Sequence, residues 1–183
     1  MNVLRFLNRQ KICAIDRQML NRVARALLED LREGGGYTLG VHLVGAQEMT
    51  GLNERFLRHE GSTDVITFDY TPSRREIERL GFRTEYSGDE VLSWWRPSLH
   101  GEIFICVDEA LAQARRYGVL WQTEMVRYLV HGLLHLDGCD DSKPNLRRAM
   151  KRKENKLLKE LSRRFDLGKL GRVNKSLGAH ERK

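Results

Sequence analysis

The stretch of the chain that most restricts its fold is VHGLLHLDGCDD, residues 130–141. His131 and His135 are four residues apart, so on a helix their rings lie one turn apart on the same face. The leucines beside them predict a helix that packs into the core, with its histidines at the wall of a pocket. Gly138 stands where a helix needs a left-handed residue to end, and such a turn would carry the acidic residues that follow back toward the histidines.

This arrangement is suited to binding one metal ion. Two imidazole nitrogens at this spacing can reach one ion at about 2.0–2.1 Å, and a carboxylate is an acceptable third ligand of zinc. We expect His131, His135 and Asp141 to hold one zinc ion per chain and to leave a coordination position free for water. A histidine pair alone often occurs on helices that bind no metal; the glycine and the acidic pair strengthen the prediction. Cys139 could compete as a ligand, but one thiolate is less suited to a site that activates water.

The hydrophobic pattern in the rest of the chain predicts interleaved strands and helices. Strands are expected at residues 2–7, 37–44, 64–70 and 101–107. Helices are expected from Asp16, as N-cap, to Leu31, then at 46–57, from Asp108, as N-cap, to Tyr117, at 121–136 and at 143–164. The elements do not alternate strictly and the helices cluster late, which is typical of an α+β fold or a mixed sheet.

The length of 183 residues predicts one domain, which we assign to residues 1–164. Residues 71–100 hold two of the three prolines and are expected to form an insertion with a short helix at 73–80. The pair Trp94-Trp95 within it could stack on bases, although packing over the core is favoured. Residues 165–183 are basic and glycine-bearing, and we expect a disordered tail there.

The net charge of +7 is unevenly distributed. Residues 143–183 hold fifteen Lys and Arg against four Asp and Glu, whereas residues 1–142 hold 17 against 21. A basic segment on a mildly acidic body predicts a polyanionic partner, most simply nucleic acid. A solvated basic helix face would give the same pattern, so the charge supports RNA without establishing it. The candidate RNA contacts are Arg147, Arg148, Lys151 and Arg152.

The sequence gives no support for a membrane-spanning protein or for a secreted protein with disulfide bonds. No stretch approaches the roughly 18–20 uninterrupted apolar residues of a membrane span, and the start, MNVLRFLNRQK, is too basic for a secretory signal. Three cysteines, Cys13, Cys106 and Cys139, do not make a disulfide framework. We therefore expect a cytoplasmic protein without a membrane or DNA partner.

Two enzyme families share the skeleton of the metal motif. The metzincin peptidases use H-E-x-x-H-x-x-G-x-x-H/D, with the glutamate as general base. Here the glutamate position is Gly132, which cannot accept a proton, so a peptidase is disfavoured. The motif more closely resembles the H-G-x-L-H-L-x-G-Y-D-H signature of the YbeY endoribonucleases, with Cys139 in place of the aromatic residue and Asp141 in place of the third histidine.

The resemblance to the YbeY family extends beyond this motif. The segment GSTDVITFDY, residues 61–70, resembles the family's P-T-D-V-L-S-F segment, and Leu52-Asn53 and Gly101-Glu102-Ile103 resemble other family landmarks. Membership implies a mixed four-stranded sheet with about five helices and a metal at a cleft. It also implies cleavage of single-stranded RNA, maturation of the 3′ end of small-subunit ribosomal RNA, and ribosome quality control.

Two positions depart from the family pattern. The family commonly has an arginine directly after an aromatic residue before the T-D-V strand, but here Leu57 follows Phe56 and Arg58 comes one place later. One residue along a helix rotates a side chain by about 100°, so Arg58 is only a candidate catalytic residue. Asp141 adds a negative charge that should make the metal a weaker Lewis acid. No residue is assigned as the general base; Asp64 is expected to order the backbone of its strand.

One alternative from a different class remains open. A non-catalytic ribosome-assembly factor could bind RNA through the same basic residues and use the metal structurally, because binding alone needs no open coordination position. Cleavage and binding measured separately, with and without chelator, would distinguish the two.

Overall fold

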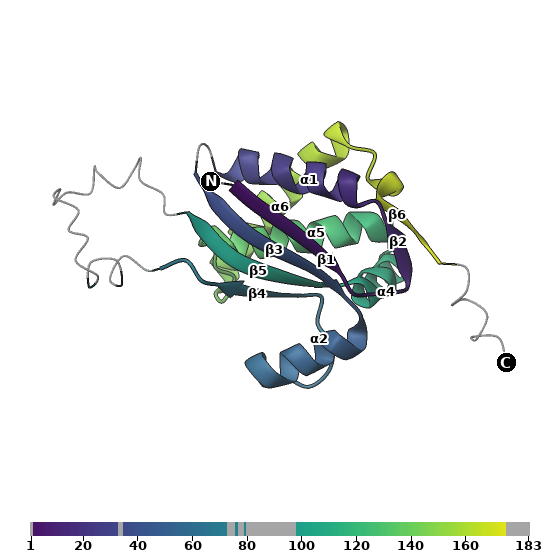
Figure 1. The fold of residues 1–183 in the computed structure, drawn as a ribbon, viewed down its shortest axis with the longest axis horizontal. Helices are drawn as coiled ribbons and strands as arrows, with labels where there is room; N and C mark the ends of the chain where they lie inside the picture. The colour runs from purple at the N-terminus through teal and green to yellow at the C-terminus, as the bar shows by residue number, and fades with distance from the viewer. Residues whose placement is uncertain (1, 33–34, 73–75, 77–78, 80–97, 175–183) are drawn as a thin grey trace.

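The framework of the fold is a four-stranded sheet. The computed structural model describes residues 2–32, 35–72, 76, 79 and 98–174. Four strands form one sheet in the order β1 (Asn2–Asn8), β3 (Tyr37–Val44), β5 (Leu99–Cys106) and β4 (Val65–Asp69) (Figure 1). The first three are parallel and β4 is antiparallel to β5. This confirms the expected α+β fold with a mixed four-stranded sheet.

The two central strands owe their position to apolar residues on the face that packs against helices. Val41 pairs with Ile103 and Leu43 with Ile105, and all four side chains are at most 1% exposed. A central strand has a neighbouring strand on each side and is covered by the helices packed on the sheet. The valine, isoleucine and leucine side chains of these two strands suit such a buried position.

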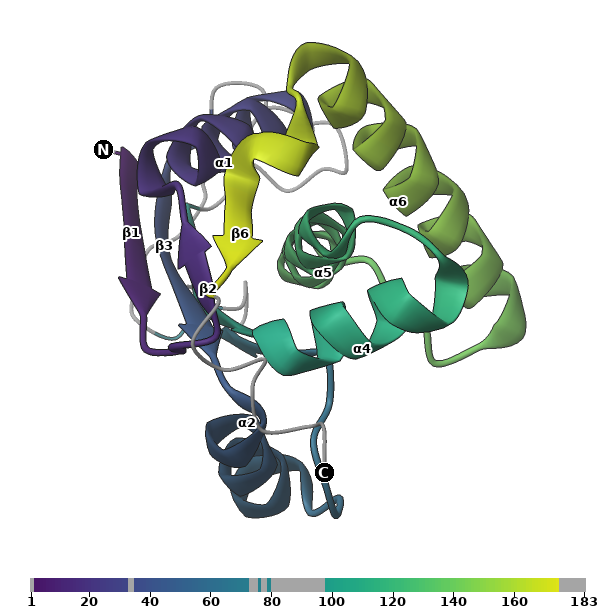
Figure 2. The same cartoon turned by 90° about the vertical axis from the view of Figure 1, so that its right-hand side faces the viewer.

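Helix α5 (Trp121–Leu136) is the centre of the helical layer. Figure 2 shows α5 nearly end-on, surrounded by α1 (Arg17–Leu31), α4 (Val107–Tyr117) and α6 (Pro144–Arg164). Most of its residues are buried, as expected for a helix that is apolar around most of its circumference. The histidine motif therefore lies on a rigid element at the middle of the protein.

Asp16 and Asp108 were both expected to cap the helices that follow them. Asp16 does so, accepting a hydrogen bond from the Met19 N–H at 2.9 Å. Asp108 does not, because the N-cap of α4 is Cys106, two residues earlier. The Asp108 carboxylate instead accepts from the Ala46 N–H at 2.9 Å, so it caps a different helix, whose own N-cap, Gly45, has no side chain.

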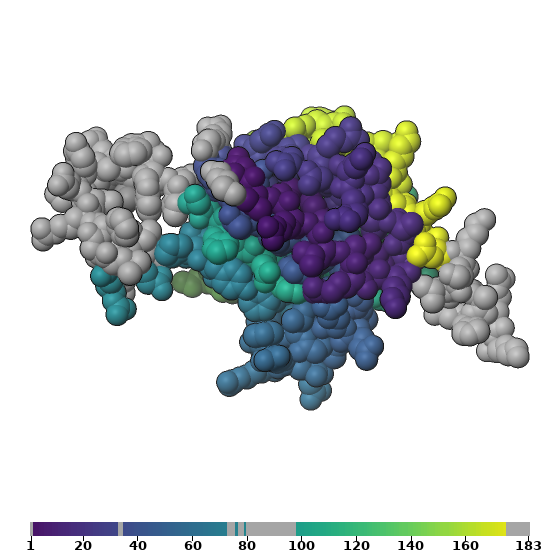
Figure 3. All heavy atoms as spheres, viewed as in Figure 1, coloured from purple at the N-terminus to yellow at the C-terminus, as the bar shows by residue number. Residues whose placement is uncertain are grey.

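That second helix belongs to a lobe at one end of the sheet. It comprises α2 (Ala46–Leu52) and a π-helical turn η1 (Asn53–Leu57), together matching the helix expected at 46–57. Figure 3 shows this lobe projecting from the body of the molecule. Its end carries two exposed apolar side chains, Phe56 and Leu57.

The expectation of a disordered tail from residue 165 is wrong for its first part. A 3-10 turn, η3 (Leu167–Leu170), leads into strand β6 (Gly171–Val173), which pairs antiparallel with an unexpected strand, β2 (Cys13–Ile15). Leu167 and Leu170 are 4% and 0% exposed and belong to the core. Burial of these two leucine side chains stabilises an ordered segment here, although its composition is basic and contains glycine. Residues 175–183 lie outside the described residues.

The expected insertion can be compared with the structure only at its ends. Leu99 and His100 belong to β5, which begins two residues earlier than expected. Most of the helix expected at 73–80, and the pair Trp94-Trp95, lie outside the described residues. Within the described part of the chain, no helix is both long and apolar enough to cross a membrane.

Candidate metal centre

The histidine helix ends as its glycine predicts. Gly138 has a φ of +85°, the left-handed conformation that glycine adopts without strain. Its N–H donates to the carbonyl of His135, and the Cys139 N–H donates to that of Leu134, both at 2.9 Å. This pair of hydrogen bonds is the Schellman ending, which turns the chain back along the helix.

A second turn decides which aspartate meets the histidines. The Asp140 carboxylate accepts from the Ser142 hydroxyl at 2.6 Å and from the Ser142 N–H at 2.9 Å, and these hydrogen bonds lower the pKa of Asp140. Arg147 donates from Nε to the backbone carbonyl of Asp141 at 3.1 Å. With Asp140 occupied in the turn, Asp141 is the aspartate directed at the paired rings.

The structure brings the three expected ligands together. One donor atom from each of His131, His135 and Asp141 lies within 4.8 Å of the others. The two Nε2 atoms are 3.1 Å apart, and the rings are inclined at 83°. Two ligand atoms at about 2.0–2.1 Å from a tetrahedral ion are about 3.4 Å apart, so this donor set fits zinc after small rotations of the side chains.

Each histidine is also held at its other ring nitrogen. Nδ1 of His131 is 3.1 Å from Oε2 of Glu154, and Nδ1 of His135 is 3.1 Å from the backbone carbonyl of Cys139. Both acceptors require a proton on Nδ1 and so leave the Nε2 lone pairs free for a metal. Acceptors of this kind are typical of histidines that bind metals in proteins.

Glu154 is the most buried charged residue at the site, at 3% exposed. Besides His131, it accepts from Lys151 at 2.6 Å and from Arg127 at 2.8 Å. Burial raises the pKa of Glu154, but the hydrogen bonds from His131, Lys151 and Arg127 outweigh it and lower this pKa to about 2. The carboxylate is therefore ionised at neutral pH.

A cavity of about 230 Å³ opens beside the histidines. Its walls come from α5, α6, the loop between them and the start of β4; they comprise Asp64, Arg127, Tyr128, His131, Asp141, Arg147, Met150, Lys151 and Glu154. Two of the expected RNA contacts, Arg147 and Lys151, line it, whereas Arg148 and Arg152 are exposed elsewhere on α6 and do not.

Asp64 lies at the edge of this cavity and orders the start of its strand, as expected. Its Oδ1 accepts from the Val65 N–H at 2.9 Å and from the Thr63 hydroxyl at 3.1 Å. Its carbonyl accepts from the Cys106 N–H at 2.9 Å, which joins the beginning of β4 to the end of β5.

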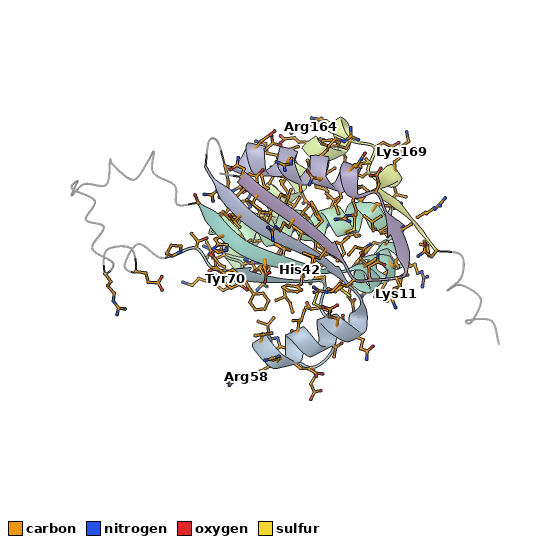
Figure 4. The ribbon with its side chains drawn as sticks, viewed as in Figure 1. Lys11, His42, Arg58, Tyr70, Arg164 and Lys169 are labelled. Atoms are coloured by element: carbon orange, nitrogen blue, oxygen red, sulfur yellow. The ribbon has the colours of Figure 1, made fainter. Side chains whose placement is uncertain are left out.

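Arg58 is not brought to the cavity. It ends η1 in the left-handed conformation, with a φ of 58°, and Figure 4 shows it at the free end of the lobe. It is absent from the residues that line the cavity, so a catalytic role for Arg58 stays a prediction from the sequence alone.

The position of Gly132 explains why no general base can occupy it. A β-carbon there would lie 2.9 Å from Cγ2 of Ile103 and 3.1 Å from Cγ2 of Thr67. The residue thus faces the sheet, and glycine allows α5 to pack directly against β5 and β4. A larger side chain would meet the core before it met the cavity.

Two residues of the site were missed by reasoning from the sequence. Glu154 occupies the apolar stripe of α6, between the buried residues Met150 and Leu158, and a charged residue in such a stripe was an available signal. Arg127 precedes His131 by one helical turn and therefore shares its face of α5. Its position suggested proximity, but nothing in the sequence showed that both residues meet the same carboxylate.

Comparison with known proteins shows sequence similarity to one family over most of the chain. The family model described as endoribonuclease YbeY matches residues 5–162. A protein of that name from Chlorobaculum parvum is 33% identical over 135 residues, covering 73% of this chain and 79% of the relative. Its namesake from Thermobifida fusca is 33% identical over 143 residues, covering 78% and 84%.

The solved structures add evidence for the fold. The solution structure of TM1509 from Thermotoga maritima matches with a TM-score of 0.55 and 23% identity, covering 88% of this chain and 91% of that one. At that identity the match supports the fold alone. On the family match and the sequence identities, the chain belongs to the YbeY family of endoribonucleases.

Proposed function

We propose that this protein is a zinc-dependent endoribonuclease that cleaves single-stranded RNA at the site formed by His131, His135 and Asp141. The observation that carries the proposal is the convergence of these three donors at the wall of a cavity that also holds arginine and lysine side chains. The family name of the relatives supports RNA as the substrate.

The chain's own residues supply binding and orientation. A zinc ion at the three donors would polarise a phosphoryl oxygen and favour attack by water. Arg147 and Lys151 reach the cavity from α6 and can hold phosphate oxygens by charge-assisted hydrogen bonds. Arg127 forms ion pairs with Glu124 at 3.2 Å and with Glu154 at 2.8 Å. These ion pairs hold its guanidinium in one orientation at the wall of the cavity.

The charge balance of the cavity makes phosphate binding depend on the metal. Three cationic side chains, Arg127, Arg147 and Lys151, face three carboxylates among the lining residues. A divalent cation therefore gives an otherwise balanced pocket an excess of positive charge, which favours a phosphodiester. The exposed basic residues of α6, including Arg148 and Arg152, would hold the rest of the RNA backbone.

The biological role proposed is maturation of the 3′ end of small-subunit ribosomal RNA together with ribosome quality control. Family membership supports this role, and the basic surface of α6 is compatible with a ribosomal partner. With this role we propose a cytoplasmic location, where bacteria assemble their ribosomes.

The test measures cleavage and binding separately. Purified protein should contain one equivalent of zinc and should cut a single-stranded RNA oligonucleotide, and a chelator should abolish cleavage. The double variant His131→Ala/His135→Ala should lose both zinc and cleavage while it retains binding through α6. One equivalent of zinc in that variant would contradict the ligand assignment. RNA binding without cleavage under any divalent metal would favour the non-catalytic assembly factor.

A further inference from the structure

We propose that Glu154 is a positioning residue that sets the tautomer of His131 and thereby the affinity of the site for its metal. The inference rests on the proposed function only in taking His131, His135 and Asp141 as metal ligands. It concerns a residue on a different helix from these ligands, 23 positions away from His131 in the chain.

The two oxygens of the Glu154 carboxylate have different partners. Oε2 is 3.1 Å from Nδ1 of His131, whereas Oε1 accepts from Lys151 at 2.6 Å and from Arg127 at 2.8 Å. The side chain is 4% exposed, so water does not compete freely for either oxygen. Because the two cations occupy Oε1, Oε2 is left as the acceptor for His131.

This division fixes the proton on the His131 ring. An acceptor at Nδ1 stabilises the tautomer with Nδ1 protonated, and only that neutral tautomer offers its Nε2 lone pair to a metal. A carboxylate partner also increases the basicity of Nε2, which strengthens the bond to the ion. Glu154 would therefore act on the metal through His131 without touching it.

His135 provides an internal reference for this effect. Its Nδ1 is 3.1 Å from the backbone carbonyl of Cys139, an acceptor that the Schellman turn holds in place and that no side-chain substitution removes. Of the two histidines, only His131 depends on a replaceable side chain. A change at Glu154 should therefore affect the two rings unequally, which a general loss of stability would not do.

The substitution Glu154→Gln tests this proposal, because the two oxygens of the carboxylate have different partners. Lys151 and Arg127 have only donors, so they should draw the amide oxygen of the glutamine to their side. The NH₂ group would then face Nδ1 of His131 and favour the tautomer with the proton on Nε2, where the metal should bind. We expect zinc affinity to fall by about 10–100-fold, as is typical when such a partner is removed.

Two control variants separate this effect from its alternatives. Glu160→Gln makes the same chemical change six residues later on α6, at a partly exposed position outside the cavity, and should leave zinc affinity unchanged. Lys151→Gln removes one cation from Oε1 but leaves the contact between Glu154 and His131, so it should leave the tautomer of His131 unchanged. If the charge of the cavity alone set zinc affinity, Lys151→Gln would raise that affinity by about as much as Glu154→Gln lowers it, and this result would overturn the proposal.

The measurements are zinc titration against a competing chelator and ¹⁵N NMR of the histidine rings, without RNA. In the wild-type protein both rings should have protonated Nδ1 and, with zinc, ligated Nε2. In metal-free Glu154→Gln only His131 should change tautomer. An unprotonated Nδ1 of His131 in the zinc-loaded wild-type protein would overturn the proposal even if the variant does not fold. A wild-type protein that binds no zinc would instead defeat the proposed function, so the two failures are distinguishable.

Discussion

The close packing of α5 on the sheet can be tested with the substitution Gly132→Ala. A β-carbon at this position would lie 2.9 Å from Cγ2 of Ile103, 3.1 Å from Cγ2 of Thr67 and 3.3 Å from Cδ1 of Ile103. Carbon atoms pack at about 3.5–4.0 Å, so at least one of these groups must move by several tenths of an ångström. Ile103 is 0% exposed and its Cγ2 is attached directly to Cβ, so it has little freedom to rotate away.

The magnitude follows from two opposing effects. Overpacking of a core by one methyl group typically costs about 1–3 kcal/mol in the free energy of unfolding. Replacing glycine by alanine inside a helix recovers about 1 kcal/mol. We expect a net loss of about 1 kcal/mol in Gly132→Ala, which corresponds to a Tm lower by about 2–4 °C for a chain of this length.

A second glycine provides the matched control. Gly51 lies inside α2, and a β-carbon there would meet nothing within 4 Å. Gly51→Ala should therefore gain about 1 kcal/mol, and the difference between the two variants, about 2 kcal/mol, isolates the packing cost at Gly132. Urea unfolding followed by circular dichroism measures both. Equal stabilisation of the two variants would refute the contact between α5 and the sheet as described.

Three further predictions concern the metal, the RNA and the C-terminal segment. Asp141→His removes a negative ligand, so the acid limb of the pH–rate profile for RNA cleavage should move to lower pH; an unchanged or opposite shift would contradict a ligand role. Arg147→Ala should lower kcat/KM for RNA cleavage, and it should reduce the slope of the log of the RNA-binding constant against the log of the salt concentration by about 0.7. Arg148→Ala should also change this slope but should leave kcat unchanged. Leu170→Ala should lower the free energy of unfolding by about 2–5 kcal/mol, because the side chain is 0% exposed. The control Lys169→Ala changes the exposed neighbouring residue and should have almost no effect on that free energy. Equally small effects of the two substitutions would mean that this segment does not stabilise the core.

The features that the sequence predicted correctly depend on neighbours in the chain. The spacing of His131 and His135, the turn at Gly138 and the aspartate at 141 lie within eleven residues, and local geometry alone brings them together. The cap at Asp16 is also local, since its partner is three residues away. Periodicity gave the helices and strands for the same reason.

The features that the sequence did not predict depend on contacts between distant segments. Asp108 has the composition and position of a local cap, yet its hydrogen bond goes to Ala46, 62 residues away. Strands β2 and β6 are three residues each, too short to show a period, and they exist because they pair with each other across the whole chain. Which of the basic residues of α6 reach the cavity depended on the rotation of that helix, which no local rule specifies.

The aspartate at position 141 and the basic residues around it are best understood together. At the proposed metal site, a third histidine would leave the ion with its full double charge, whereas Asp141 as a ligand would neutralise half of it and weaken its pull on a phosphodiester. Arg147 binds the backbone of that same aspartate at 3.1 Å and faces the cavity with Lys151 and Arg127. Without Asp141, the cavity lining holds three cationic side chains against two carboxylates, Asp64 and Glu154, so the walls can supply the one charge that Asp141 would remove from the metal. On this argument the aspartate and the cations should be interdependent, and removing Arg147 should reduce cleavage more in the native protein than in Asp141→His.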